Sequence, residues 1–197
     1  MGKIFYFMGK SSTGKDTIYR QILSDNKLKL RKIVPYTTRP IRANEEEGRE
    51  YHFITEQDVE RMQAEGRIIE LRSYDTFHGT WKYMTVDDGR VKLDKHSYIM
   101  IGTLEAYQKV AEYYGEENVV PILIVVDDGI RLQRALNRER NQLTPRYQEM
   151  CRRFLADEAD FSRENLERAH IQPVFENIVL DDTVAQVTAY IRSIQNR

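Results

Sequence analysis

The chain has 197 residues, 41% of them hydrophobic and 31% charged, which fits one α/β domain or a core with small inserted lobes. Its 30 basic and 31 acidic side chains give a formal net charge of −1, so no overall field attracts nucleic acid or a membrane, and we expect neither as a partner. The single cysteine, Cys151, excludes an internal disulfide, fits a reducing compartment and is expected to be a small buried residue.

The first predicted elements are a strand over residues 4–8, a glycine-rich loop and a helix. Two glycines let the loop curl so that successive N–H groups and the helix N-terminus point at one anion, while Lys15 reaches the β- and γ-phosphates of a nucleotide. The predicted ATP-binding residues are Gly9, Lys10, Ser11, Ser12, Thr13, Gly14, Lys15, Asp16 and Thr17. The apolar run at residues 4–8 does not follow the basic-then-hydrophobic pattern of a leader peptide, and no apolar segment is long enough to span a bilayer. We therefore expect a cytoplasmic protein.

The loop departs from the pattern G-x-x-x-x-G-K-[ST] at one position. Asp16 stands where the pattern places a metal-binding hydroxyl, and Thr17 supplies a hydroxyl one residue later. We hypothesise that Asp16, with Thr17 as a second candidate ligand, serves Mg²⁺ bound with ATP. An acid in the first turn of a helix is equally favoured by the helix dipole, so both interpretations of Asp16 stay open.

The next elements complete a β-α-β unit and then leave the main sheet. A short strand over residues 28–34 is ended by Pro35, and residues 36–50 are polar. A strand at 51–54, a helix at 56–65 capped by Gly66, and strands at 67–74 and 80–85 predict a small mixed lobe over about 35–85. The main sheet resumes with a strand at 98–101, a helix at 104–114 and an apolar strand at 119–126 that is buried on both faces.

The C-terminal part begins with an arginine-rich helical segment. Either Asp127 or Asp128 is expected to cap a helical pattern that runs from 130 to about 160 and is interrupted near 142–145. A strand at 178–180 and a helix at 184–194 close the chain. We therefore predict an α/β fold with a parallel sheet, helices on both faces, a small mixed lobe and a helical lid. The expected single domain has core segments of about 1–34, 86–126 and 161–197, a lobe of 35–85 and a lid of 127–160.

A block within the polar insertion resembles guanylate kinases. Residues 37–53 read TTRPIRANEEEGREYHF, and that family carries T-T-R, a second arginine three residues later, then Glu, Gly, Tyr and Phe in this spacing. The resemblance extends over essentially the whole chain in the order of its elements. It implies a P-loop nucleoside monophosphate kinase that moves the γ-phosphoryl of ATP to GMP or dGMP, with Mg²⁺ and without a covalent intermediate.

The resemblance also implies an acceptor site. Arg39, Arg42 and Tyr51 would hold the acceptor phosphate, because two guanidinium forks and a phenol can saturate a dianion. Glu70 would accept hydrogen bonds from guanine N1–H and its amino group, which adenine cannot match, so AMP is disfavoured. The implied GMP-binding residues are Tyr36, Arg39, Arg42, Glu45, Tyr51, Glu70, His78 and Thr80. Glu45 could orient the arginines or simply be solvated.

The arginine-rich segment resembles the lid that closes over the transferring phosphoryl group. Arg134 and Arg138 are spaced as i, i+4, and Arg152 or Arg153 would contribute from the next helix. Phosphoryl transfer depends mainly on positioned positive charge and on exclusion of water. The implied catalytic residues are Lys15, Arg39, Arg134, Arg138 and Arg152.

Three departures from the family's pattern keep alternatives open. Tyr36 stands where the family has serine and His78 where it has tyrosine, and aspartates are missing near the end of the strand at 98–103. His78 is either a pH-sensitive phosphate contact or a packing substitute. A kinase of another phosphorylated acceptor, such as a ribose bisphosphate, and a non-catalytic module that binds phosphorylated proteins are the alternative functions. Lys15 and both loop glycines argue against the module, and the oligomeric state stays open.

Overall fold

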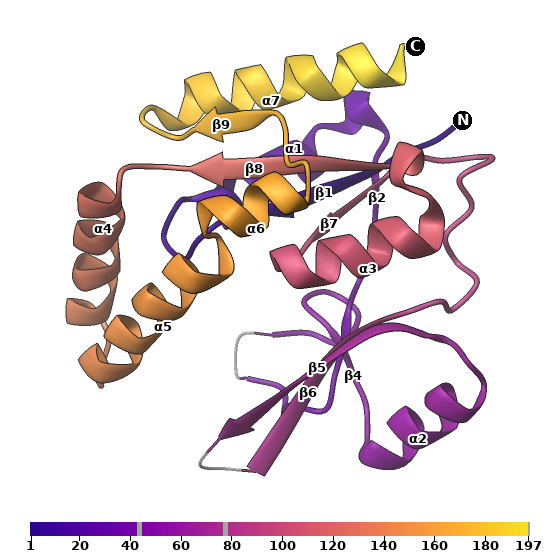
Figure 1. The fold of residues 1–197 in the computed structure, drawn as a ribbon, viewed down its shortest axis with the longest axis horizontal. Helices are drawn as coiled ribbons and strands as arrows, with labels where there is room; N and C mark the ends of the chain where they lie inside the picture. Colours follow the sequence, from indigo (N-terminus) through magenta and orange to yellow (C-terminus); the bar gives the residue numbers. More distant parts are fainter. Residues whose placement is uncertain (43–44, 77–78, 197) are drawn as a thin grey trace.

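The main sheet holds five parallel strands in the order β2-β7-β1-β8-β9, in a computed structural model that describes residues 1–42, 45–76 and 79–196. The strands are β1 (Ile4–Met8), β2 (Arg31–Lys32), β7 (Tyr98–Ile101), β8 (Val119–Val125) and β9 (Val174–Glu176). β1 is central and every one of its residues is buried. Its apolar run therefore anchors the loop that follows at the carboxyl edge of the sheet (Figure 1).

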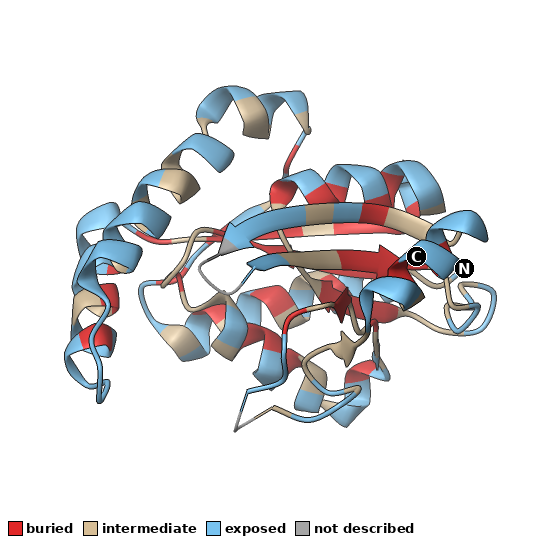
Figure 2. Ribbon diagram, turned by 90° about the horizontal axis from the view of Figure 1, so that it is seen from below, coloured by how far each residue is buried: buried red, intermediate tan, exposed pale blue. Residues whose placement is uncertain are grey.

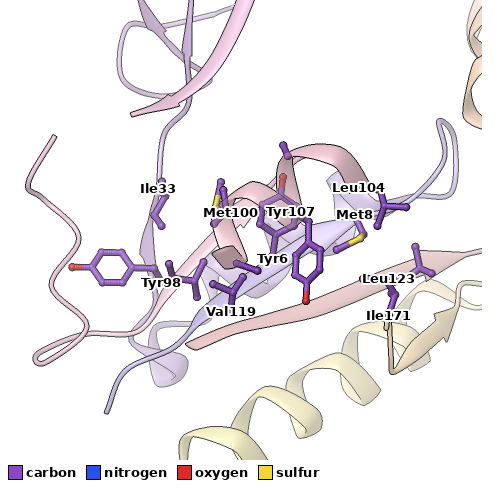
Figure 3. Close-up of a cluster of buried hydrophobic side chains, with 14 of the residues drawn as sticks. Tyr6, Met8, Ile33, Tyr98, Met100, Leu104, Tyr107, Val119, Leu123 and Ile171 are labelled. Carbon is purple, nitrogen blue, oxygen red and sulfur yellow. The ribbon is translucent and has the colours of Figure 1, made fainter. Parts of the chain in front are cut away.

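Helices cover both faces of this sheet. On one face, α1 (Lys15–Ser24) and α7 (Leu180–Gln195) pack apolar residues such as Ile18 and Val187 against Phe5 and Phe7. On the other face, α3 (Leu104–Tyr114) and the short α6 (Arg163–Arg168) cover a cluster that includes Tyr6, drawn in Figure 3. The alternating side chains of β1 thus feed two cores, as expected for a strand buried on both faces.

A second sheet forms a separate lobe with the order β4-β3-β6-β5. Its strands are β3 (Tyr36–Thr37), β4 (His52–Phe53), β5 (Ile68–Thr76) and β6 (Gly79–Val86), and α2 (Glu56–Ala64) covers it. α2 starts at a capping box made by Thr55 and Asp58, and its Val59 and Met62 pack on Met84 in a small core. The lobe lies below the main sheet in the view of Figure 1.

Two helices project from the carboxyl end of β8. They are α4 (Asp128–Arg140) and α5 (Tyr147–Asp160), and they pack on each other beside the glycine-rich loop of residues 9–17, the predicted phosphate loop (Figure 1). Asp127 caps α4, because its Oδ1 accepts from the N–H groups of Gly129 and Ile130 at 2.9 and 3.2 Å. No residue of α5 is buried, whereas α1, α3 and α7 on the main sheet each bury apolar residues; Figure 2 colours the chain by burial.

The expected α/β class with a parallel sheet and a small mixed sheet is confirmed, and several local predictions are wrong. The strand expected at 28–34 is a 3-10 turn, η1 (Asn26–Leu28), followed by only Arg31–Lys32. The strand expected at 178–180 does not form: β9 is Val174–Glu176, and Ile178 is 63% exposed. α6 and a second 3-10 turn, η2 (Glu116–Asn118), were not predicted.

Cys151 is also a correction, because its side chain is exposed rather than buried. It lies on α5, which packs on α4 and the loop instead of on a sheet and so has no deeply buried face. The apolar run at 178–180 was wrongly predicted as a strand because another apolar residue takes the place beside β8. Phe175 fills the core position beside β8, which leaves the later residues to lead into α7.

Candidate functional site

The phosphate loop needs its two glycines because other backbone and side-chain atoms approach them closely. Gly9 and Gly14 have φ values of 151° and 89°, and Gly14 directly precedes α1. A Cβ at Gly9 would overlap the carbonyl oxygen of Ile124, and a Cβ at Gly14 would overlap Nδ2 of Asn177. The loop is therefore held against β8 on one side and against the segment after β9 on the other.

Ser12 is the most unusual residue of the loop. Its φ of 67° is left-handed although it is not glycine, and its buried Oγ has no hydrogen-bond partner within the described residues. Backbone strain of this kind is concentrated at binding sites, and an unpartnered buried hydroxyl calls for an explanation. A ligand that supplies the missing hydrogen bond would account for both features.

Polar contacts tie this loop to residues that are distant in sequence. Asn177 is buried, and its Nδ2 donates to the carbonyl oxygen of Thr13 at 2.7 Å. Arg134 of α4 donates to the same carbonyl at 3.4 Å and to the carbonyl of Asn177 at 3.2 Å. Lys15 forms an ion pair with Asp16 at 3.1 Å, and the Asp16 side chain is 69% exposed.

Carboxylates of α5 contact the start of the loop. Asp157 Oδ2 accepts from the Ser11 N–H at 2.7 Å, and Glu158 pairs with Lys10 at 2.6 Å. Arg131 is only 1% exposed and pairs with Asp157 at 3.3 Å and with Glu158. A phosphate-bearing ligand that uses the Ser11 N–H or Lys10 would have to displace these carboxylates.

The predicted lid arginines do not all reach the loop. Arg153 donates to Ser11 Oγ at 3.2 Å, and Arg138 and Arg153 line a narrow cavity of about 30 Å³ between α4, α5 and Ser11. Arg152 instead bonds to Glu149 at 2.8 Å on the exposed face of α5. The structure thus brings Arg134, Arg138 and Arg153 to the loop, whereas Arg152 points toward its helical neighbour.

A larger cavity lies at the carboxyl end of β8. It measures about 330 Å³ and is bounded by Lys10, Thr13, Val125, Asp127 and Phe161 among others. Open α/β sheets bind ligands beyond the carboxyl ends of their strands, and this cavity lies at such an edge beside the phosphate loop.

In the second sheet, Arg39 is held in a buried cage. The residue is 3% exposed. Its guanidinium lies 5.4 Å from the ring centroid of Tyr51 and 5.6 Å from that of Phe53. It also donates to both carboxylate oxygens of Glu45, at 2.9 and 2.8 Å. Glu45 also accepts from the Arg42 N–H at 2.9 Å. The hydrogen bonds from Arg39, opposed in part by burial, lower the pKa of Glu45 below its ordinary 4.5. Arg42 itself is exposed.

Glu70 is buried farther along the same sheet. Thr85 Oγ1 donates to Glu70 Oε1 at 2.8 Å, and Arg72 Nε donates to Oε2 at 2.9 Å. Arg72 Nη1 also donates to Thr103 Oγ1 at 3.1 Å, at the N-cap of α3. Arg72, Thr85 and Thr103 were not among the predicted site residues. The i, i+2 spacing of Glu70 and Arg72 in a predicted strand was the one available signal, because it places both side chains on one face.

The remaining predicted acceptor residues are placed differently. Thr80 pairs with Asp75 in the hairpin and donates to its Oδ1 at 2.8 Å, whereas Glu70 pairs with Thr85. Five residues of strand separate Thr80 from Thr85, about 16 Å, so the structure does not bring Thr80 and Glu70 together. The hydroxyl of Tyr36 donates to Asp88 at 3.1 Å while its ring packs in the lobe core. His78 lies outside the described residues.

Tyr51 and Tyr83 join the Arg39 cage to the Glu70 pair. Their ring centroids are 5.7 Å apart, and Tyr83 is the register partner of Arg72 on the neighbouring strand. One face of the second sheet therefore carries a buried arginine, two tyrosines and an ion pair in succession. Such a face can bind an anion at the arginine and a planar polar group at the ion pair.

The described residues form neither a membrane-spanning helix nor a cluster of metal-binding side chains. Within the described residues, no helix is long and apolar enough to cross a membrane. In the same part of the chain, no three His, Cys, Asp or Glu side chains gather into a group that could hold a metal ion by themselves.

Comparisons with known proteins agree with one another. A family model described as guanylate kinase matches residues 1–194. The guanylate kinase of Mycoplasmoides gallisepticum is 41% identical over 80 residues, which are 40% of this chain and 41% of that protein. The guanylate kinase of Brucella melitensis is 31% identical over 141 residues, 70% of this chain and 61% of that protein. The matched segments thus span under two thirds of either relative.

Solved structures with the same fold include a guanylate kinase from Anaplasma phagocytophilum. It aligns with a TM-score of 0.65 and 22% identity over 100% of this chain and 87% of that one. An uncharacterized protein from Eubacterium ventriosum aligns with a TM-score of 0.51 and 13% identity over 98% of this chain. At these identities the likeness concerns the fold.

Proposed function

The chain belongs to the guanylate kinase family, and from that premise we propose that it transfers the γ-phosphoryl group of ATP to GMP, giving ADP and GDP. The observation that carries the proposal is that one fold holds two separate sites whose chemistry suits a phosphate group. A strained glycine-rich loop lies at the edge of the main sheet, and a caged arginine with a neighbouring ion pair lies on the second sheet. A transferase with two nucleotide substrates needs this arrangement.

The phosphate loop would hold the donor. The loop N–H groups and Lys15 bind the β- and γ-phosphates at the N-terminus of α1, and the unpartnered hydroxyl of Ser12 lies within the same cradle. Lys15 would exchange its exposed ion pair with Asp16 for the phosphates. That exchange is favourable because the phosphates carry more charge than one carboxylate.

The second sheet would hold the acceptor. Arg39, Arg42 and Tyr51 bind the phosphate of GMP, and the carboxylate of Glu70 accepts from the guanine N1–H and amino groups. The cage around Arg39 supports this role, since a guanidinium whose rotamer is set by two aromatic rings loses little entropy on binding. Glu45 would share the guanidinium with the incoming phosphate or release it.

The lid would complete the site. Arg134, Arg138 and Arg153 lie beside the loop, where they can stabilise charge that develops on the transferring phosphoryl group. Closing of α4 and α5 with the second sheet would exclude water and align the acceptor oxygen with the γ-phosphate. No covalent intermediate on the protein is required.

A magnesium ion is part of the proposal. Mg²⁺ bound with nucleotides commonly takes one or two protein oxygens and completes its shell with phosphates and waters, so a cluster of three acids is not needed. The exposed carboxylate of Asp16 and the hydroxyl of Thr17, both in the first turn of α1, fit this requirement. When bound, the ion would neutralise phosphate charge.

Release of ADP tests the proposal directly. Purified protein is incubated with ATP and Mg²⁺ together with GMP, dGMP, AMP, UMP, CMP or a ribose bisphosphate. We expect turnover with GMP, and with dGMP, and a fall of about 100-fold or more in Lys15→Ala, because the lysine charge is aimed at the phosphates. Lys109→Ala, which removes an exposed lysine on α3, is the matched control.

Each other result has a definite meaning. Turnover with a different acceptor would replace GMP as the substrate. Binding of GMP without any turnover would support a binding module and overturn the proposed transfer. Equal activity in Lys15→Ala and Lys109→Ala would remove the phosphate loop from the mechanism.

A further inference from the structure

Arg72 links two parts of the protein, β5 of the second sheet and the start of α3. On β5 it forms an ion pair with Glu70 through Nε at 2.9 Å and Nη2 at 3.4 Å, and through Nη1 it reaches Thr103 at the start of α3. The side chain of Glu70 is 3% exposed and that of Arg72 is 15% exposed. The guanidinium is therefore the more accessible half of a nearly buried pair.

A count of hydrogen-bond capacity shows what this pair can still bind. The guanidinium has five N–H donors, and three are used by Glu70 and Thr103. The carboxylate has about four acceptor positions, and Thr85 and Arg72 take three of them, one through the long 3.4 Å contact. Within the described residues, the pair thus offers at least one further acceptor and two further donors side by side.

A buried pair with spare donors and acceptors favours a ligand of the opposite pattern. A 6-oxopurine with a protonated N1 presents a donor and an acceptor next to each other on its edge, and a 2-amino group adds a second donor. Adenine presents an unprotonated N1 and a 6-amino group in those places. In the same position, adenine would set its N1 against the carboxylate and its 6-amino group against the guanidinium, so both would lack partners.

We propose that Arg72 is a specificity-determining residue of the acceptor site, which donates a hydrogen bond to O6 of the acceptor purine while Glu70 accepts from N1–H. This inference rests on the proposed function. It adds a contact from a residue outside the predicted acceptor set, and it gives the site two points of discrimination against adenine instead of one.

The bond to Thr103 explains how the guanidinium is held. Thr103 Oγ1 caps α3 by accepting from the Ala106 N–H at 3.3 Å, so its position is set by the main domain and not by the acceptor lobe. Arg72 is thereby fixed at both ends, by Glu70 on its own strand and by Thr103 across the boundary. A fixed donor binds O6 with a smaller loss of side-chain entropy than a free one.

The experiment compares GMP with 6-thio-GMP, which keeps N1–H and the amino group but carries a weakly accepting sulfur at position 6. We measure kcat/KM and the dissociation constant of each for the unaltered protein, for Arg72→Met and for Arg61→Met. We expect the unaltered protein to prefer GMP by roughly tenfold or more, the effect of one charge-assisted hydrogen bond. In Arg72→Met we expect that preference to fall toward one, chiefly through KM. Arg61 is an exposed arginine of the same lobe, and its variant should keep the preference.

A merely structural role for Arg72 predicts another result. If Arg72 only positions Glu70, its substitution weakens the binding of both nucleotides equally. The preference for GMP over 6-thio-GMP then keeps its original value, which would overturn the inference. Thr103→Val provides a second variant that leaves the ion pair intact, and it should lower the preference for GMP over 6-thio-GMP. Arg72→Lys should retain part of that preference. Thermal unfolding of each variant identifies any that fail to fold.

Failure of the proposed function is distinguishable from failure of this inference. If the unaltered protein binds GMP without turnover, the transfer is wrong, but the ratio of dissociation constants still tests Arg72. If GMP neither binds nor reacts, the acceptor site itself is wrong and the inference falls with it. If GMP reacts and Arg72→Met keeps the full preference over 6-thio-GMP, only the inference is overturned.

Discussion

Gly14 faces the segment after β9 so closely that a Cβ there would overlap Nδ2 of Asn177. We expect Gly14→Ala to lower the free energy of unfolding by about 1–3 kcal/mol and to weaken binding of a non-hydrolysable ATP analogue, because the added Cβ would displace Asn177. Urea unfolding and calorimetry measure the two effects.

Gly66→Ala is the matched control for that substitution. Gly66 also has a left-handed φ, 67°, but a Cβ there would meet no atom within 4 Å. It therefore reports the backbone strain alone. Equal losses of stability and unchanged nucleotide binding in both variants would show that the approach of Asn177 has no role in the loop.

Glu45 gives the lobe of the second sheet a pH-dependent stability. Its pKa is lowered in the folded protein, mainly by hydrogen bonds from Arg39, so the ionised form stabilises the fold. This contribution is fully present above the ordinary pKa of 4.5 and is lost as the pH falls through the lower folded pKa. We expect Glu45→Gln to destabilise the protein near neutral pH and the difference to shrink at about pH 3.

The measurement is a series of urea midpoints across that pH range for the unaltered protein and for Glu45→Gln. Glu60→Gln, at an exposed glutamate on α2, is the control and should follow the unaltered protein throughout. A difference between the unaltered protein and Glu45→Gln that grows with acidity would contradict stabilisation of the fold by ionised Glu45.

At the scale of elements, Arg131 is the residue that ties α4 to α5. It is almost fully buried, lies 3.8 Å from the Phe154 ring centroid, and pairs with carboxylates of both helices. We expect Arg131→Met to cost about 1–3 kcal/mol, because Asp157 keeps only the Ser11 N–H while Glu158 keeps Lys10. The partial exposure of these carboxylates keeps the loss below that of a fully buried pair.

Hydrogen exchange locates this loss. In Arg131→Met the amides of α5 should exchange faster while those of β1 and β8 keep their protection, since α5 buries no residue and β1 is fully buried. Arg163→Met removes an exposed i, i+4 pair with Glu167 and should change little. Uniformly faster exchange in all elements would mean that Arg131 stabilises the whole protein and not the lid.

The interior strands of the main sheet were predicted better than its edge strands, β2 and β9. β7 and α3 have the predicted limits, and Asp127 caps α4 as one of two candidates. The C-terminal strand was displaced by four residues because the apolar run 178–180 has the composition of a strand. Local composition cannot decide which of two apolar segments β8 selects as its partner.

At the scale of the whole molecule, two nucleotide sites on separate sheets should stabilise the protein independently. A ligand at 100 times its dissociation constant adds about 2.7 kcal/mol to the free energy of unfolding. We expect this from a non-hydrolysable ATP analogue and from GMP. Lys15→Ala should abolish only the first effect, and Arg42→Met should reduce only the second, as measured by thermal unfolding. Loss of both effects in either variant would contradict separate sites.

The sequence by itself determined the interior strands of the main sheet, the glycine-rich loop with its two glycines, and the block of residues 37–53 that resembles guanylate kinases. These features are local, so the spacing of apolar, glycine and charged residues is sufficient to identify them. Tertiary structure alone decided that Arg153 rather than Arg152 reaches Ser11, that Asn177 bonds Thr13, and that Arg72 joins Glu70 to Thr103. Such contacts join residues from separate elements, and their geometry follows from how sheets and helices pack, which no local pattern records.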